Sequence, residues 1–469
     1  MVLAKFAPIA ALTALLAAFV APSAAALQVH SNVHRALRAQ GTVNLIISMK
    51  EGTEKVVTSV KESDFADRGQ KIASLVDSLE RNSQETQKTL TNLLSQEASS
   101  TETLFAEYKS FWISNQVYIK GATFELLEKL VVDPSIASII EEPVAEIPHL
   151  IGATAAVNAS NLTATEWGLQ KIKIPEIWAT GNIGQNVVVG TIDSGVIVAH
   201  DILKDNFRSS YNWFDPQGGA SPYDSGGHGT FTAGILVGSN GVGVAPGATL
   251  MTCKGCTADG CVLSDLLACA EFMTCPTDPA GNNKDCSKAP HLVSNSWVYL
   301  SNDNSYQAAV NVWHAAGIIP IFAIGNNGDF GCDFTRSPGD LPNVIGVGAT
   351  DSDDLLAPFS SKGPGVKGQV KPDISAPGVS IYSAWGTNET SYRTASGTSA
   401  ATPHVAGVVA LLLNAKPGLN YEQVKNALIS TADTDLKLTG ESCGTTPDGT
   451  FPNNNYGYGR VNAVRVLNA

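Results

Sequence analysis

Apolar runs and helical periodicities alternate along the last two-thirds of the chain. Near-continuous apolar runs predict buried strands at residues 187–192, 291–295, 318–323 and 344–347. Helical spacing of apolar residues predicts helices at 231–237, 263–272, 308–316 and 405–412. Continuous apolar strands separated by helices indicate a parallel sheet covered on both faces, so this part is predicted to be an α/β domain. In such a domain, chemistry collects where the carboxyl ends of strands meet helix N-termini.

The first third of the chain shows a different and shorter pattern. Strands are predicted near residues 43–48, between 112 and 120, and at 136–142, with helices at 72–79 and 124–130. This order of elements describes a small α+β unit. The unit contains no cysteine and no paired nucleophile, so its residues indicate no chemistry of their own.

The first 26 residues have the composition of a secretory signal peptide. Lys5 is the only charged residue before Arg35, an Ala/Leu-rich apolar run covers residues 6–20, and small residues at 24–26 suit a cleavage site. A membrane anchor is the alternative, because the uncharged stretch is long enough to span a bilayer. The small-residue end favours removal, and we expect a secreted, extracellular protein.

Composition adds a division into domains. The chain has 469 residues, a net charge of −13 and 43 % hydrophobic residues, which excludes wholesale disorder and argues against binding to nucleic acid. Charged residues are denser before about residue 150, and all eight cysteines lie after it. We therefore expect a signal peptide at 1–26, one folded unit at 27–150, a linker at 151–165 and a second unit at 166–469.

The cysteines of an exported chain, being even in number, predict structural disulfides. Their pairing stays open among Cys253, Cys256, Cys261, Cys269, Cys275, Cys286, Cys332 and Cys443. Cys253 and Cys256 form a C-x-x-C motif, so zinc or redox chemistry is the alternative, but no second pair of ligands has zinc spacing. Candidate glycosylation sites are Asn158, Asn161 and Asn388.

Three segments at predicted strand–helix junctions carry chemically useful side chains. T-I-D-S-G ends a strand at Asp193, G-G-H-G-T places His228 in a glycine-rich turn, and G-T-S-A-A-T-P-H puts Ser399 at the start of a helix. Singly, an Asp or Ser at such a place is usually a cap. Together they supply a hydroxyl nucleophile, a base to take its proton and an acid to orient that base.

In the chain order Asp, His, Ser, these segments resemble the signatures of the subtilisin-like serine proteases, the subtilases of peptidase family S8. The resemblance covers about residues 165–465, and segments 295–297 and 337–340 look most like the bacillopeptidase-F-type branch. It implies a three-layer αβα catalytic domain built on a parallel sheet. It also implies that residues 27–150 are a small α+β, ferredoxin-like propeptide.

The resemblance implies a role for each matched residue. Ser399 would attack the peptide carbonyl, His228 would carry the proton and Asp193 would orient the imidazole. The side-chain amide of Asn326 and the backbone N–H of Ser399 would bind the oxyanion. The primary substrate pocket would be lined by Ser296, Trp297, Val298, Ala323 and Gly325.

Metal binding and specificity are less determined by the sequence. No cofactor is expected for the chemistry, but many subtilases bind structural calcium. Residues 239–243 look too short for the strongest calcium loop of the family, and a weaker site would lie near 338–344 with Asp373. Arg336, near the expected pocket floor, would either favour an acidic substrate side chain or simply be exposed or ion-paired.

The sequence therefore predicts a secreted serine endopeptidase made as an autoprocessed zymogen. Its propeptide would act as intramolecular inhibitor and chaperone, with residues 140–150 extended along the active-site cleft and the maturation site in the 151–165 linker. Expected partners are protein or peptide substrates and the propeptide itself, with no membrane, no nucleic acid and a monomeric state. The alternative is a catalytically inactive secreted binding protein on the same fold.

Overall fold

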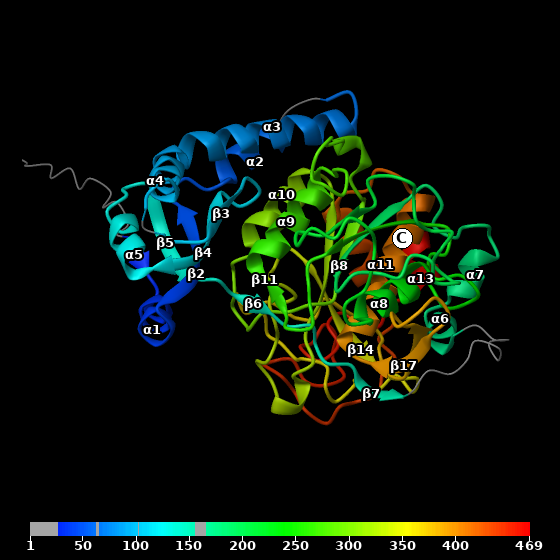
Figure 1. The fold of residues 1–469 in the computed structure, drawn as a ribbon. Coiled ribbons are helices and arrows are strands. Elements are labelled where there is room, and N and C mark those ends of the chain that lie inside the picture. The colour runs from blue at the N-terminus through cyan, green and yellow to red at the C-terminus, as the bar shows by residue number, and fades with distance from the viewer. Residues whose placement is uncertain (1–26, 62–64, 102, 155–165) are drawn as a thin grey trace, which may run out of the picture.

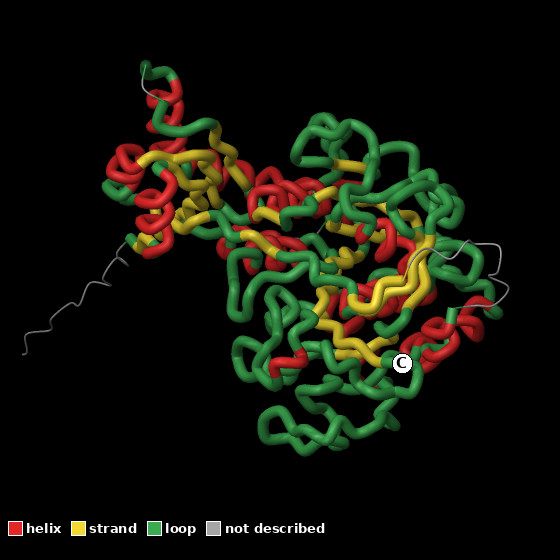
Figure 2. Tube along the Cα trace, turned by 60° about the horizontal axis from the view of Figure 1, so that its bottom comes forward, coloured by secondary structure: helices red, strands yellow, loops and turns green. Residues whose placement is uncertain are grey.

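The computed structural model describes residues 27–61, 65–101, 103–154 and 166–469. They form a small N-terminal domain, up to about residue 143, beside a larger α/β domain, and a connecting segment leads from one to the other (Figure 1). Figure 2 shows the same two lobes from another side. The predicted signal peptide and the candidate glycosylation sites Asn158 and Asn161 lie outside the described residues, whereas Asn388 is exposed.

The larger domain is built on a seven-stranded parallel sheet, in the strand order β15-β14-β13-β12-β8-β10-β9. Its strands are β8 (Val188–Asp193), β9 (Trp213–Phe214), β10 (Thr249–Lys254), β12 (Leu292–Asn295), β13 (Ile319–Ala323), β14 (Ile345–Thr350) and β15 (Ile374–Pro377). The principal helices are α8 (His228–Val237), α9 (Leu263–Thr274), α10 (Gln307–Ala315) and α11 (Thr398–Ala415). The predicted parallel α/β domain is confirmed.

Alternating side chains of the strands build one core on each face of this sheet. In β13, Ile319 and Ile321 pack in the same buried cluster as α8 and α11, whereas Phe322 packs on the other face against Trp313 of α10. Helices therefore cover both faces of the sheet, which gives three layers. Because the strands are buried on both faces, they can carry apolar residues at every position. Helix α11 is long and apolar enough to cross a membrane, but 89 % of its 18 residues are buried in this core.

The remaining short elements complete the larger domain and the connecting segment. They are β6 (Val144–Ala145), β7 (Ile151–Thr154), β11 (Cys261–Val262), β16 (Ile381–Ala384), β17 (Tyr392–Ser396), α6 (Trp167–Lys171), α7 (Ile174–Trp178), α12 (Tyr421–Ser430) and α13 (Ala463–Asn468). Two of them matter for the site, because β6 pairs with β11 and β7 pairs with β17.

The N-terminal domain is a five-stranded sheet in the order β1-β5-β2-β4-β3, covered by helices. Its elements are β1 (Gln28–Val29), α1 (Ser31–Gln40), β2 (Thr42–Met49), α2 (Glu54–Lys61), α3 (Arg68–Thr86), α4 (Lys88–Ala98), β3 (Glu107–Phe111), β4 (Gln116–Thr123), α5 (Phe124–Leu130) and β5 (Ile136–Glu141). The strand predicted between 112 and 120 is wrong at its start. Residues 112–115 are the turn of the β3–β4 hairpin, and Ile113 is buried there without being in a strand.

All eight cysteines are paired. The disulfides are Cys253–Cys269, Cys256–Cys261, Cys275–Cys286 and Cys332–Cys443. The two cysteines of the C-x-x-C motif therefore have different partners, and the zinc or redox interpretation is wrong for this structure. The sulfurs of Cys332 and Cys443 also lie near the Glu441 carboxylate, but disulfide sulfurs carry no thiolate to bind a metal.

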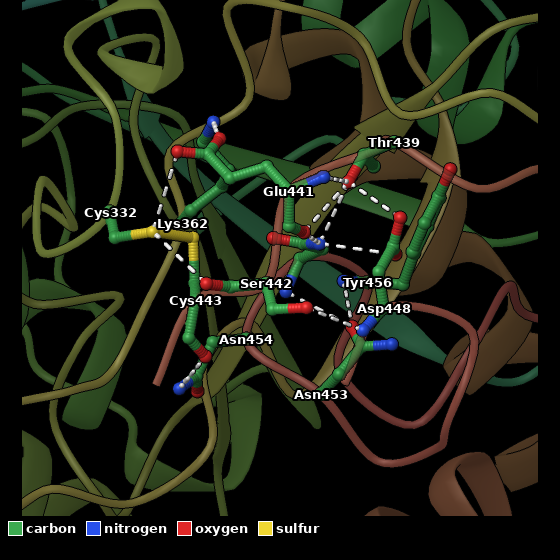
Figure 3. The surroundings of a disulfide bond; sticks show 11 residues. Cys332, Lys362, Thr439, Glu441, Ser442, Cys443, Asp448, Asn453, Asn454 and Tyr456 are labelled. Carbon is green, nitrogen blue, oxygen red and sulfur yellow. Dashed lines mark hydrogen bonds and ion pairs between the residues drawn. A yellow bond between two sulfur atoms is a disulfide. The ribbon is translucent and has the colours of Figure 1, made fainter. Parts of the chain in front are cut away.

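The Cys332–Cys443 bridge ties two distant loops together, as Figure 3 shows. It closes a separation of 111 residues, and constraining a loop of that length stabilises a fold by about 4–5 kcal/mol in the chain-entropy account. One loop leaves the end of β13, and the other belongs to the C-terminal region. Beside the bridge, Lys362 pairs with Glu441, and the Asn454 side chain donates to the Cys443 carbonyl at 3.0 Å.

Candidate active site

Asp193 and His228 meet where β8 ends and α8 begins. The Nδ1 atom of His228 lies 2.7 Å from Oδ1 of Asp193, and both side chains are buried. The carboxylate is held by two further donors, the Ser194 N–H at 2.7 Å and the Thr232 hydroxyl at 3.1 Å. Because a carboxylate only accepts, the proton of the neutral imidazole belongs on Nδ1. The Nε2 atom is then the basic nitrogen, and it is buried with no hydrogen-bond partner among the described residues.

A tight turn after β8 brings these residues together. Gly195 has a φ of +110°, and a Cβ there would come within 1.9 Å of the Tyr223 carbonyl oxygen. Only glycine fits, since other residues avoid this backbone region and would also collide. The turn therefore allows the segment before His228 to pack directly on the end of β8.

Ser399 lies in the first turn of α11 and is fully buried. Its hydroxyl donates to the Ser296 carbonyl at 3.4 Å, a long contact that a stronger acceptor could replace. The first backbone N–H groups of a helix have no partner within the helix, so the Ser399 amide is a natural donor to an anion beside its own side chain.

Asn326 is held next to this helix N-terminus in one orientation. Its Oδ1 accepts from the Thr398 N–H at 2.9 Å and from the Thr398 hydroxyl at 2.8 Å. Since the backbone N–H can only donate, the amide cannot be flipped, and Nδ2 must face away from Thr398. That Nδ2 donates to the carbonyl oxygen of His149 at 3.3 Å.

Arg336 supports the segment that carries Asn326. Its Nε donates to Asn327 Oδ1 at 2.7 Å, and its Cγ would lie 2.4 Å from a Cβ placed on Gly325. Gly325 has a φ of +106°, so the close approach of Arg336 and the backbone conformation both require glycine. Arg336 is half-buried and makes no ion pair within the described part of the chain.

Among the residues predicted to line the primary pocket, Trp297 has its side chain in the core. It is fully buried and packs edge-on against Tyr306 and Phe322. Its neighbour Val298 exchanges two backbone hydrogen bonds with Glu146, at 2.8 and 2.9 Å. Ala323 ends β13 and is buried.

The chain that connects the two domains runs through this site. β6 pairs with β11, Glu146 pairs with Val298, and the His149 carbonyl reaches Asn326. β7 then pairs with β17, which immediately precedes Gly397 and α11. Sequence reasoning did not find His149 as a site residue, because its contribution is a backbone carbonyl that no motif marks.

The family of this chain follows from its similarity to known proteins. The sequence profile of the Subtilase family matches residues 184–459. The chain is 34 % identical to Bacillopeptidase F of Bacillus subtilis over 442 residues, which is 88 % of this chain and 30 % of that protein. It is 35 % identical to Subtilisin DY of Bacillus licheniformis over 272 residues, covering 57 % of this chain and 90 % of the relative.

Subtilisin BL of Lederbergia lenta is 33 % identical over 302 residues, or 63 % of this chain and 96 % of that protein. The chain belongs to the Subtilase family and is a serine endopeptidase. It spans about 30 % of the length of Bacillopeptidase F.

Proposed function

We propose that this protein is a secreted endopeptidase made as a zymogen, in which Ser399, His228 and Asp193 are the catalytic triad. The Ser399 oxygen attacks a peptide carbonyl while His228 Nε2 takes its proton, and the imidazolium formed is stabilised by Asp193. The oxyanion accepts from Asn326 Nδ2 and the Ser399 N–H. His228 then protonates the leaving amine, and water hydrolyses the acyl-enzyme by the same route.

One observation carries the zymogen part of the proposal: the His149 carbonyl oxygen is already hydrogen-bonded to Asn326 Nδ2. The chain is held extended, like a substrate, by pairing on both sides of His149. Glu146 pairs with Val298 before it, and Ile151 pairs with Ser396 after it. This course supports His149–Leu150 as the bond that Ser399 attacks. Attack would form an ester between Ser399 and the His149 carbonyl carbon and release the amine of Leu150.

We expect the first self-cleavage of the precursor to fall between His149 and Leu150, just before the 151–165 linker in which the sequence analysis predicts the maturation site. Mass spectrometry of the earliest products should find one fragment that ends at His149 and another that begins at Leu150. Dilution distinguishes cleavage within one molecule from cleavage of one molecule by another, because the rate of an intramolecular cut is independent of precursor concentration. A first cut within 155–165, with His149–Leu150 still intact, would contradict this assignment.

The N-terminal domain is also held on the larger domain away from the triad. Arg68, at the start of α3, donates to the carbonyls of Ala289 and Pro290 at 3.0 and 2.5 Å. Glu271 of α9 accepts from the backbone N–H groups of Trp112 and Ile113, at 2.7 and 3.3 Å. These contacts support the proposal that residues 27–149 stay bound as an inhibitor after the chain is cut.

Glu271 gives this association an expected pH dependence. Burial under the N-terminal domain raises the pKa of Glu271 from 4.5 to about 8, against the opposing effect of the two backbone N–H groups and Lys109. A group whose pKa is raised in the complex takes up a proton on binding, so affinity is greatest below about pH 4.5 and is lost as pH rises through 8. We expect the cut complex to weaken by up to about tenfold per pH unit between 5 and 8.

Gel filtration of the cut complex at a series of pH values measures this effect. The matched control is Glu271→Gln, which keeps an acceptor oxygen but cannot ionise, and its complex should lose most of the pH dependence. Equal pH dependence in the two proteins would show that other groups govern the association.

A further inference from the structure

A buried cluster of opposite charges lies below the loop that joins Arg336 to β14. Lys371 is fully buried, and its ammonium donates to Asp373 Oδ2 at 2.6 Å and to the Val344 carbonyl at 3.1 Å. A second ammonium, that of Lys425, lies 2.7 Å from Asp373 Oδ1 and 3.3 Å from the Pro342 carbonyl oxygen. Both lysines therefore point at oxygens of the loop and at the same carboxylate.

The surroundings of the Lys371 ammonium are made of oxygen atoms. Asp373 is fixed in place, because its Oδ2 also accepts from the Gly346 N–H at 2.8 Å. A Cβ on Gly346 would come within 2.3 Å of the Gly339 carbonyl oxygen and 3.3 Å of the Lys371 Nζ, so these two groups line one small space. Carboxylate and carbonyl oxygens are the ligands that hard metal cations prefer. Here a side-chain ammonium occupies the position that such a cation would take.

The charges of this cluster balance without a metal. Lys371 and Lys425 face Asp373, and Asp340 is the second acid whose charge acts on Lys371. Burial lowers the pKa of Lys371, but the Asp373 and Asp340 carboxylates oppose that effect and favour the ammonium form. A divalent ion added here would be repelled by two ammonium groups at close range. The residues at 338–344 and Asp373 therefore do not fit the weak calcium site that the family resemblance suggested.

We propose that the Lys371 ammonium is a built-in cation, which replaces a structural metal ion beneath the 338–344 loop and makes this region independent of added metal. The loop is continuous with Arg336, which supports the Asn326 segment through Asn327.

Two substitutions in the full-length precursor carrying Ser399→Ala test the proposal without self-digestion. Lys371→Ala removes the charge and opens a space, whereas Lys371→Met removes the charge but keeps the volume. In a buffer that contains a chelator and no alkali-metal ions, both should lower the unfolding temperature by about 10 °C relative to the parent precursor. Millimolar Ca²⁺ or about 0.1 M K⁺ should restore much of the loss in Lys371→Ala only. The parent precursor should show the same unfolding temperature in all three solutions.

Failure of every cation to stabilise folded Lys371→Ala, or equal rescue of the Lys371→Met protein, would overturn the proposal. If neither variant folds, crystals of the parent precursor grown with Ca²⁺ decide the matter. An ion in contact with Asp373 and the Val344 carbonyl would overturn the proposal, and the Lys371 ammonium in that place would support it.

Discussion

The Ser399→Ala precursor is expected to remain uncut and to hydrolyse peptide substrates about 10⁶-fold more slowly than the unchanged enzyme. Two other hydroxyls near Ser399 are already engaged: that of Thr398 donates to Asn326 Oδ1 at 2.8 Å, and that of Ser296 donates to the Ser399 carbonyl at 3.2 Å. Gel electrophoresis of the purified precursor and turnover of a chromogenic peptide measure the two losses.

Ser225 provides the matched control for this experiment. It lies three residues before His228 in a D-S-G-G segment, and its hydroxyl donates to the Ser194 carbonyl at 3.1 Å. Ser225→Ala should keep self-cleavage, because that hydroxyl only supports a turn. A Ser399→Ala precursor that matures when purified away from other proteases would refute the assignment of the nucleophile.

Asp193→Asn is expected to slow self-cleavage by about 10⁴-fold while leaving the fold intact. Asparagine has nearly the volume of aspartate but carries no negative charge. Because the Ser194 N–H donates to Oδ1, the asparagine oxygen would still face His228 Nδ1, but the imidazolium formed during attack would lose its counter-charge. Single-turnover cleavage of the precursor reports this loss directly, because no separate maturation step is needed first.

Thr232→Val separates the effect of the lost charge from a general loosening of the carboxylate. It removes the 3.1 Å hydrogen bond to Asp193 Oδ2 and leaves the 2.7 Å contact with His228. One neutral hydrogen bond supports a loss of about tenfold or less. If Thr232→Val and Asp193→Asn slowed cleavage equally, Asp193 would act by orienting the His228 imidazole and not by stabilising its positive charge.

The sequence predicted the buried strands and the junction residues because both depend on local patterns. Strands β8, β12, β13 and β14 are continuous apolar runs, so burial on both faces is visible in the sequence. β10 was missed because Thr249, Thr252 and Lys254 interrupt its apolar residues. Thr252 is nevertheless fully buried beside the Thr191 hydroxyl, which satisfies its polar group.

Features that depend on backbone contacts or on long-range pairing could not be predicted. Every residue has a backbone carbonyl, so only the path of the folded chain shows that the carbonyl of His149 reaches the site. Cys332 and Cys443 could have paired with any of the other cysteines, because spacing alone does not select a partner. Lys371 gave no such signal either, because its ammonium contacts the Val344 carbonyl, 27 residues earlier in the chain.

The two short strands that flank His149–Leu150 separate cutting from activation in time. On one side Glu146 is hydrogen-bonded to Val298, and on the other β7 is paired with β17, so each side of the bond has its own contacts with the catalytic domain. Newly cut molecules would therefore be chemically mature but still silent, with a product lying where a substrate must enter. The delay before activity appears would be the lifetime of that complex, and if the protease is exported as proposed, this delay would let it diffuse away from the cell that made it.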